Sequence, residues 1–296
     1  MGRTQASISN VKAWIWLVCA LLHVFPSTTP PAGAAFLDIV KLQPQTVGAR
    51  SPRISGLAFD GGQYPWIIDG LSWQMTRLNT VDGSAIQAYA PAIPSYGNRS
   101  LAWNPDNGKF YTMADQTYLA AIDIAAHTRV PIPGSVPLFN FLSLAFDRAT
   151  GELWLGTDRN GGELWSVNQQ TGAATFQTAI IGLGGQLTSL AIDDNGSFFV
   201  SARIDTSLGV HAIYSIDPGT SVASFVTSSS TNGADHIVAF DIEPISRRWF
   251  AVLERRSTDN GFYFGELIGI PESTTMSALL TFVLPLLTLT RGSKRK

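Results

Sequence analysis

The stretch from Phe141 to Ala173 reads Phe-Leu-Ser-Leu-Ala-Phe-Asp, then Arg-Ala-Thr-Gly, then Glu-Leu-Trp-Leu-Gly-Thr-Asp. After Gly161-Gly162 it continues as Glu-Leu-Trp-Ser-Val-Asn and Gln-Gln-Thr-Gly-Ala. Short apolar or alternating runs separated by Gly, Asn and Asp are typical of β-strands joined by tight turns. The stretch has no long segment with the spacing of an amphipathic helix. It therefore predicts a small antiparallel sheet.

The same pattern recurs along the chain. Its anchor is an apolar residue, Ala, a second apolar residue and then Asp or Asn, and successive copies begin 44, 43, 46 and 48 residues apart. A period in the forties with short strands in each unit is the signature of a β-propeller blade. We expect Ala on the innermost strand of each blade, where small side chains let several blades converge on a central channel. The five anchors are Leu57-Ala58-Phe59-Asp60, Leu101-Ala102-Trp103-Asn104, Leu144-Ala145-Phe146-Asp147, Leu190-Ala191-Ile192-Asp193 and Val238-Ala239-Phe240-Asp241.

The last unit is incomplete, because its third strand, Gly261 to Ile270, is followed by a change of composition at Pro271. The segment Phe36 to Leu42 resembles a strand from the end of a unit, and we predict that it pairs with the last unit and closes the ring. Closure removes the sheet edges that an open ring would expose. The predicted fold is an all-β, single β-propeller over residues 36–270, with five blades as the first choice and six as the alternative.

Composition limits the classes of partner. Residues 36–270 contain 21 acidic and 14 basic residues, a formal charge of −7. An acidic domain without a basic stripe argues against nucleic acid as a partner. The chain has one cysteine, Cys19, in its first segment, so the sequence predicts neither a disulfide nor thiol chemistry in the propeller.

Residues 1–35 have the features of a secretory signal. A basic start precedes the apolar run Ala13 to Phe25, and Ala32-Gly33-Ala34-Ala35 offers a small-residue cleavage site. Thirteen apolar residues are short for a membrane span, and the prolines from Pro26 to Pro31 stop a helix. The sequence therefore predicts export with cleavage near Ala35.

The C-terminal segment also carries an expectation about location. Pro271-Glu272-Ser273 is followed by an apolar run, Met276 to Thr290, and by a basic end with Arg291, Lys294, Arg295 and Lys296. Residues 271–296 resemble the PEP-CTERM sorting tail of Gram-negative bacteria, with Ser273 in place of the second Pro. The resemblance implies exosortase-type machinery as a partner, with Pro271 and Glu272 as the sorting motif, and an extracellular or cell-surface location. Residues 276–290 are then a weak or transient membrane anchor, since the basic end stays on the cytoplasmic side. The competing interpretation is an apolar tail packed on the domain.

The propeller sequence contains no Gly-x-Ser-x-Gly, no phosphate-binding glycine loop and no His-Glu-x-x-His motif. Its histidines, His127, His211 and His236, fall at different points of their repeats, which argues against a histidine metal cluster. The fold nevertheless predicts a polar channel mouth, because the first strand of a blade begins, and the second ends, on the same face. The candidate ligand residues of that face are Asp69, Asn98, Arg99, Asp115, Asn140, Asp158, Asp235, His236 and Glu254.

Converging carboxylate and amide oxygens suit a hard cation such as calcium, or a polar or sugar ligand. The alternative is that Asp is simply favoured in the turn between the second and third strands. The leading hypothesis is an exported, surface-associated propeller that binds an extracellular polysaccharide or protein without catalysis. The runner-up is a metal-dependent hydrolase or lyase of the lactonase kind that uses the channel-mouth oxygens. Propellers host both kinds of function.

Overall fold

The computed structural model describes residues 35–42, 54–70, 74–89, 99–114, 118–134, 142–205, 210–230, 235–255 and 261–268. These residues belong to one compact unit of the chain. The predicted signal segment up to residue 34 and the tail 271–296, with its motif Pro271-Glu272, lie outside the described residues. Their predicted roles stay predictions.

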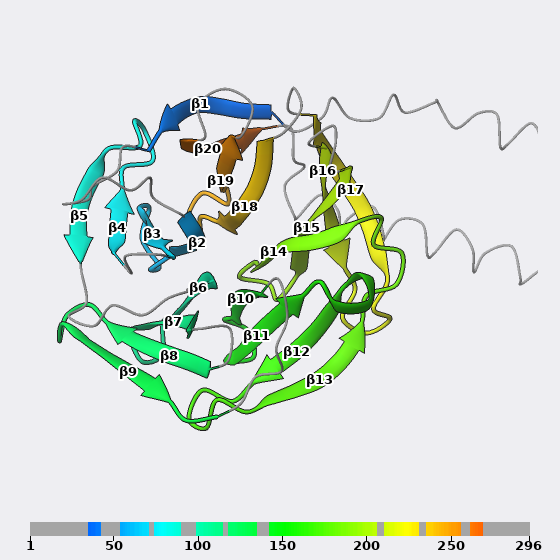
Figure 1. Ribbon diagram of the computed structural model, residues 1–296, viewed down its shortest axis with the longest axis horizontal. Coiled ribbons are helices and arrows are strands. Elements are labelled where there is room, and N and C mark those ends of the chain that lie inside the picture. Colours follow the sequence, from blue (N-terminus) through cyan, green and yellow to red (C-terminus); the bar gives the residue numbers. More distant parts are fainter. Residues whose placement is uncertain are drawn as a thin grey trace, which may run out of the picture. The chain divides into compact units, whose positions relative to one another are not determined.

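Five four-stranded antiparallel sheets form a ring of blades (Figure 1). The first strand of each blade lies innermost and the fourth outermost (Figure 1). Blade 1 contains β2 (Ile54–Phe59), β3 (Pro65–Asp69), β4 (Met75–Leu78) and β5 (Ala85–Tyr89). Blade 2 contains β6 (Arg99–Asn104), β7 (Lys109–Ala114), β8 (Tyr118–Asp123) and β9 (Thr128–Ile132). Blade 3 contains β10 (Leu142–Asp147), β11 (Glu152–Thr157), β12 (Glu163–Val167) and β13 (Ala174–Ala179).

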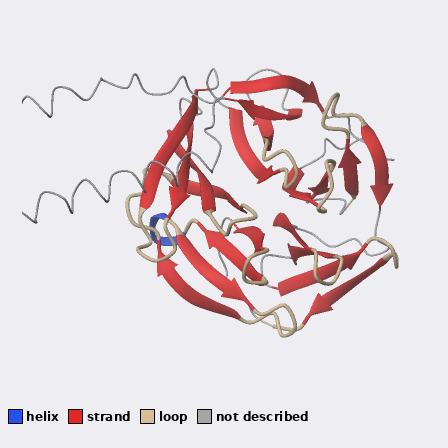
Figure 2. Cartoon of the chain, turned by 180° about the vertical axis from the view of Figure 1, so that it is seen from behind, coloured by secondary structure: helices blue, strands red, loops and turns tan. Residues whose placement is uncertain are grey.

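Blades 4 and 5 complete the ring. Blade 4 contains β14 (Gln186–Ile192), β15 (Phe198–Asp205), β16 (Val210–Ile216) and β17 (Ala223–Ser230). Blade 5 contains β18 (Asp235–Ile242), β19 (Trp249–Arg255), β20 (Gly261–Ile268) and the N-terminal strand β1 (Ala35–Lys41). The reverse view shows an architecture built almost wholly of strands (Figure 2), and the one helical element of the described residues is the 3-10 turn Arg159–Gly161. No helix in the described ranges has the length and apolar character needed to cross a membrane.

Strand β1 closes the ring as predicted. It pairs antiparallel with β20, from Ala35 opposite Ile268 to Lys41 opposite Tyr263. The blade formed by the two ends of the chain therefore has four strands like the others, and the outer edge of β20 is covered. The predictions of five blades and of closure by the N-terminal strand are both confirmed.

The core is divided among the junctions between blades. Each of five large clusters of buried apolar side chains joins two neighbouring blades, and the cluster between blades 5 and 1 packs Phe250 and Phe264 against Phe59 and Leu57. The rings of Phe59 and Phe250 lie 5.7 Å apart. Alternation along the inner strands produces this arrangement, because successive side chains face the two neighbouring blades in turn. Leu144 and Phe146 pack against blade 2, and Ala145 packs against blade 4, so the expectation that the alanines face the channel rather than the core between blades is wrong.

Three serines join the inner strands across these junctions. The hydroxyl of Ser143 accepts the backbone N–H of Leu190 at 2.7 Å, and that of Ser189 accepts the N–H of Phe240 at 3.1 Å. Ser100 makes the same bond to the N–H of Leu144. The donors Leu144, Leu190 and Phe240 therefore occupy equivalent positions in blades 3, 4 and 5.

This equivalence corrects the register of the fifth anchor. The anchor alanines lie opposite an aromatic residue of the second strand, as Ala145 lies opposite Trp154 and Ala191 opposite Phe199. In blade 5 the corresponding pair is Asp241 opposite Phe250. Asp241, not Ala239, therefore occupies the alanine position of the ring, and the turn that follows begins two residues later than the sequence repeat predicts.

Candidate functional site

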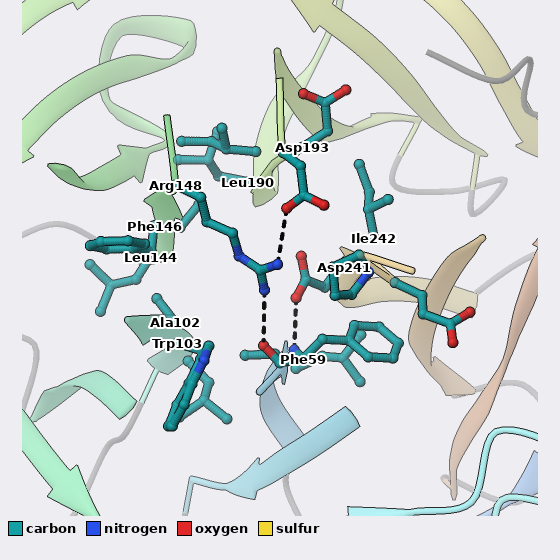
Figure 3. A pocket seen from close by; sticks show the side chains of 18 of the residues that line it. Phe59, Ala102, Trp103, Leu144, Phe146, Arg148, Leu190, Asp193, Asp241 and Ile242 are labelled. Carbon is teal, nitrogen blue, oxygen red and sulfur yellow. Dashed lines mark hydrogen bonds and ion pairs between the residues drawn. The ribbon is translucent and has the colours of Figure 1, made fainter. Parts of the chain in front are cut away.

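A cavity of about 30 Å³ lies where the innermost strands end, at one mouth of the central channel. We call this side of the ring the exit face, and the side where these strands begin the entry face. The space suffices for about two water-sized groups. Its walls come from all five blades and combine apolar side chains with charged ones (Figure 3). The charged residues of the lining are Arg148, Asp193, Asp194, Asp241, Glu243 and Arg247. The walls include Ala58, Ala102, Leu144, Ala145, Leu190 and Ile242.

Arg148 brings a positive charge to the cavity from the turn after β10. Its Nη1 donates to Asp194 Oδ1 at 2.9 Å, and its Nη2 points to the carbonyl of Phe59 at 3.5 Å. The Arg148 and Asp194 side chains are 25% and 34% exposed, so this ion pair lies at the mouth of the cavity and not beneath it. An ion pair at such a depth contributes about 0–1 kcal/mol to stability. Its main effect is to hold the guanidinium in place.

Asp241 brings a carboxylate to the cavity from blade 5, and Figure 3 shows its side chain and that of Arg148 pointing toward the same space. The Oδ2 atom of Asp241 accepts the backbone N–H of Phe59 at 2.9 Å, a bond between the last and the first blade. Burial raises the pKa of the Asp241 carboxyl from 3.8 to about 6, although the N–H groups of Phe59 and Ile242 and the charge of Arg148 oppose the rise. Within the described residues no ion pair joins Asp241 to a cation.

Glu243 forms part of the wall but is already neutralised. It is 3% exposed at its side chain and pairs with Arg248 Nη2 at 3.1 Å. Arg248 also reaches Glu266 at 3.2 Å and lies over the ring of Phe250, with its Cζ atom 5.0 Å from the ring centre. Glu243 therefore fixes the turn after β18 and offers little to a ligand.

The predicted site residues that the structure describes lie on the opposite, entry face. Antiparallel pairing brings Asp69 opposite Ile54 and Glu254 opposite His236, so the prediction that these strand ends share one face is confirmed for the described strands. Asn98, Asp115 and Asn140 lie outside the described residues. Of Arg99 and Asp235 the structure describes the backbone alone, in β6 and β18.

The predicted acidic residues do not form a ring of equivalent positions. Asp158 and Glu254 each lie four residues after the aromatic partner of the ring position, Trp154 and Phe250. Asp69 lies only three residues after Trp66 and therefore points to the other side of its sheet. Blade 4 places Arg203 where blades 3 and 5 have acids, since Arg203 lies four residues after Phe199.

Two predicted residues do belong to a polar chain across blades 3 to 5. Asp158 Oδ2 accepts Gln186 Nε2 at 2.7 Å, and Gln186 Oε1 accepts Arg203 Nη2 at 2.6 Å. Arg203 lies opposite His211 in the β15–β16 pair, and His211 Nε2 lies 3.3 Å from His236 Nδ1. The Asp158–Gln186 bond joins blade 3 to blade 4 and the histidine contact joins blade 4 to blade 5, which is a structural role.

The contact between His211 and His236 corrects an argument from the sequence. Repeat position alone separates these histidines, yet the packing of blade 4 against blade 5 brings their rings together, with centroids 5.6 Å apart. Burial, with the nearby His236 and Arg203, lowers the pKa of His211 from 6.5 to about 3. In the part of the chain that the structure describes, no three His, Cys, Asp or Glu residues are arranged to hold a metal ion.

The cavity cannot be recognised from the sequence, because its charged residues occupy ordinary positions of the repeat. Arg148 belongs to a tight turn, and Asp241 has the place of the turn-forming Asp in the fifth anchor. The sequence carries one sign of this arrangement: about two more residues separate the fifth anchor from the next strand than in the other blades. Because of these extra residues, Asp241 lies on the inner strand β18, in the wall of the cavity, and not in the turn.

No protein-family model and no curated protein matches the chain. Solved structures match in fold. A glutaminyl cyclase of Myxococcus xanthus is 13% identical, with a TM-score of 0.54 and coverage of 79% of this chain and 95% of its own. A chain in the crystal structure of a nidogen/laminin complex is 9% identical, with a TM-score of 0.51 and coverage of 81% and 98%. The five sheets define the class, a five-bladed β-propeller, and the similarities, at such identities, support the fold alone.

Proposed function

We propose that the chain is an exported, surface-associated binding module whose ligand enters the cavity on the exit face. The observation that carries this proposal is the cavity itself: walls from all five blades converge on a space with the Arg148–Asp194 ion pair at its mouth and further carboxylates, among them Asp241, in its walls. Small-molecule sites are concave and mostly apolar, with a few fixed polar groups that orient the ligand. The cavity admits only the tip of a ligand, so an extracellular polysaccharide or protein would present one group to it.

Export and surface attachment rest on the sequence of the two terminal segments. The small-residue cleavage site ends at Ala35, where β1 begins, so removal of the segment before it leaves the closing strand intact. The tail resembling PEP-CTERM would deliver the protein to exosortase-type machinery. Binding is favoured over the metal-dependent alternative because the described acids of the entry face are not equivalent in position and Asp158 is already hydrogen bonded.

The experiment fills the cavity. Ala102→Val and Ala145→Val each add two methyl groups to its wall, and Ala88→Val adds the same groups at an exposed site on β5. Melting temperatures are measured for each protein with n-butylamine, butyrate, glucosamine and oligosaccharides of extracellular polymers. We expect at least one compound to stabilise the wild type and Ala88→Val but not the cavity variants. Equal stabilisation of all four proteins would place the binding site elsewhere.

A further inference from the structure

We propose that the cavity on the exit face accepts a primary ammonium group on an unbranched chain, such as the side chain of lysine. This inference rests on the proposed binding function and names the chemistry that the cavity selects. Three observations lead to it: the state of each charged group in the wall, the size of the space, and the position of Asp241 in the ring.

The charged groups favour a cation. Arg148 is engaged by Asp194, and Glu243 is engaged by Arg248. Arg247, the other cation of the wall, donates to Asn195 Oδ1 at 3.4 Å. Asp241 is different, since its carboxylate has backbone N–H partners and no ion pair among the described residues. Asp193 of the same wall adds a second buried carboxylate of this kind, with N–H partners from Asn195 and Ser197. Burying a carboxylate without a counter-ion is costly, and its raised pKa reflects that cost. A ligand cation beside Asp241 would supply the missing charge, whereas a ligand anion would meet the same carboxylate with repulsion.

The size of the cavity restricts the cation. About 30 Å³ holds groups of the size of water, which describes an ammonium head and excludes a sugar ring or a planar guanidinium. The apolar walls, including Ala58, Ala102 and Leu144, suit the methylene groups that follow the head. The carbonyl of Phe59 offers an acceptor beside Asp241, since its contact with Arg148 is long at 3.5 Å.

The position of Asp241 supports a specific role for it. The equivalent positions in the other blades are Ala58, Ala102, Ala145 and Ala191, none of which brings a charge. Ring packing is therefore satisfied by a methyl group at four of five places. The cross-blade bond to Phe59 needs only an acceptor, which Asn would also provide. Neither the packing of the ring nor the bond to Phe59 requires the negative charge of Asp241.

The test measures binding to the full chain by calorimetry. The probes are n-butylamine, n-butanol as its uncharged counterpart, sodium chloride as a source of a bare cation, Nα-acetyl-lysine amide and glucosamine. The proteins are the wild type, Asp241→Asn, and Asp158→Asn as a matched change on the entry face. We expect saturable binding of n-butylamine and the lysine derivative, weakened at least tenfold in Asp241→Asn and unchanged in Asp158→Asn. In the wild type, binding should also weaken between pH 7.5 and pH 5 as Asp241 takes up a proton, which tests the inference without any substitution.

Several outcomes would overturn the ammonium assignment. They are equal binding of n-butanol, saturable binding of sodium ion at the same site, and n-butylamine binding that survives both Asp241→Asn and pH 5. Glucosamine binding as tight as n-butylamine would contradict the requirement for an unbranched chain. If n-butylamine fails while another compound loses its effect in Ala102→Val, the binding function stands and the ammonium assignment falls.

Discussion

Asp241 in the last blade accepts the backbone N–H of Phe59 in the first blade at 2.9 Å. In blades 2, 3 and 4 an alanine stands at the position of Asp241, and a serine two residues earlier makes the bond to the next blade. A charged side chain thus makes a cross-blade bond at a position where the other four blades have alanine. The charge carries a cost, because its pKa is raised by burial. This contrast links the closure of the ring to the proposed site.

Asp241→Asn should stabilise the protein at neutral pH. The native carboxyl has a pKa of about 6 against 3.8 in the unfolded chain, so the native state binds more protons between these values and its stability rises as pH falls through 6. Asn keeps the acceptor for Phe59 and has no charge to bury. We expect the variant to exceed the wild type by up to about 3 kcal/mol above pH 7, with the gap closing toward pH 4. Urea unfolding at several pH values measures this gap, and a gap that does not change with pH would contradict the account.

His211 should make the stability of the protein depend on pH in the opposite direction. Its native pKa of about 3 lies below the unfolded value of 6.5, so the unfolded state binds more protons in this window and stability is lost as pH falls. The loss approaches about 5 kcal/mol at the acid end. His211→Asn removes this contribution, and its stability should fall less steeply with acid than that of the wild type. Identical acid profiles for the two proteins would show that the histidine pair is not the source.

The serine bonds between blades should be individually measurable. Ser143 is buried, and its replacement by Ala leaves the N–H of Leu190 without an acceptor. A buried unsatisfied donor costs about 1–3 kcal/mol. Ser166→Ala provides the control, because the Ser166 hydroxyl bonds Gln177 in an exposed contact between strands. The Ser143 variant should lose stability by that amount and the Ser166 variant by less than about 0.5 kcal/mol. Equal losses would contradict the junction role.

Deleting residues 36–42 should open the ring. The deletion removes the cross-strand pairs between β1 and β20, each worth about 0.2–1 kcal/mol, together with the burial of Leu42 in the core between blades 5 and 1. A loss of several kcal/mol is a large share of the typical margin of about 5–15 kcal/mol. Calorimetric melting of the truncated and intact proteins measures it. A melting point within a degree or two of the intact protein would mean that β1 adds little to closure.

The repeat made the fold predictable, but not the register of its last copy. Five anchors determined the number of blades and the place of the closing strand. A shift of two residues is invisible to a pattern of period two, because Ala239 and Asp241 face the same side of β18. A shift of one residue turns a side chain to the other face of its sheet, which is why Asp69 points the opposite way from Asp158 and Glu254. The site could not be predicted because Arg148 in blade 3 and Asp241 in blade 5 come to line one cavity only when the ring of blades is closed.

The most direct test of the account is methyl NMR of the protein with labelled alanines. The compound that stabilises the wild type most is titrated while the methyl signals of Ala58, Ala102 and Ala145, which line the cavity, are followed. Ala202 and Ala212, buried in blade 4 outside the cavity lining, report on other sites. The account predicts saturable shifts concentrated on the first three methyl groups and lost in Asp241→Asn. Shifts concentrated on Ala202 and Ala212, or no saturable shift with any compound, would contradict it.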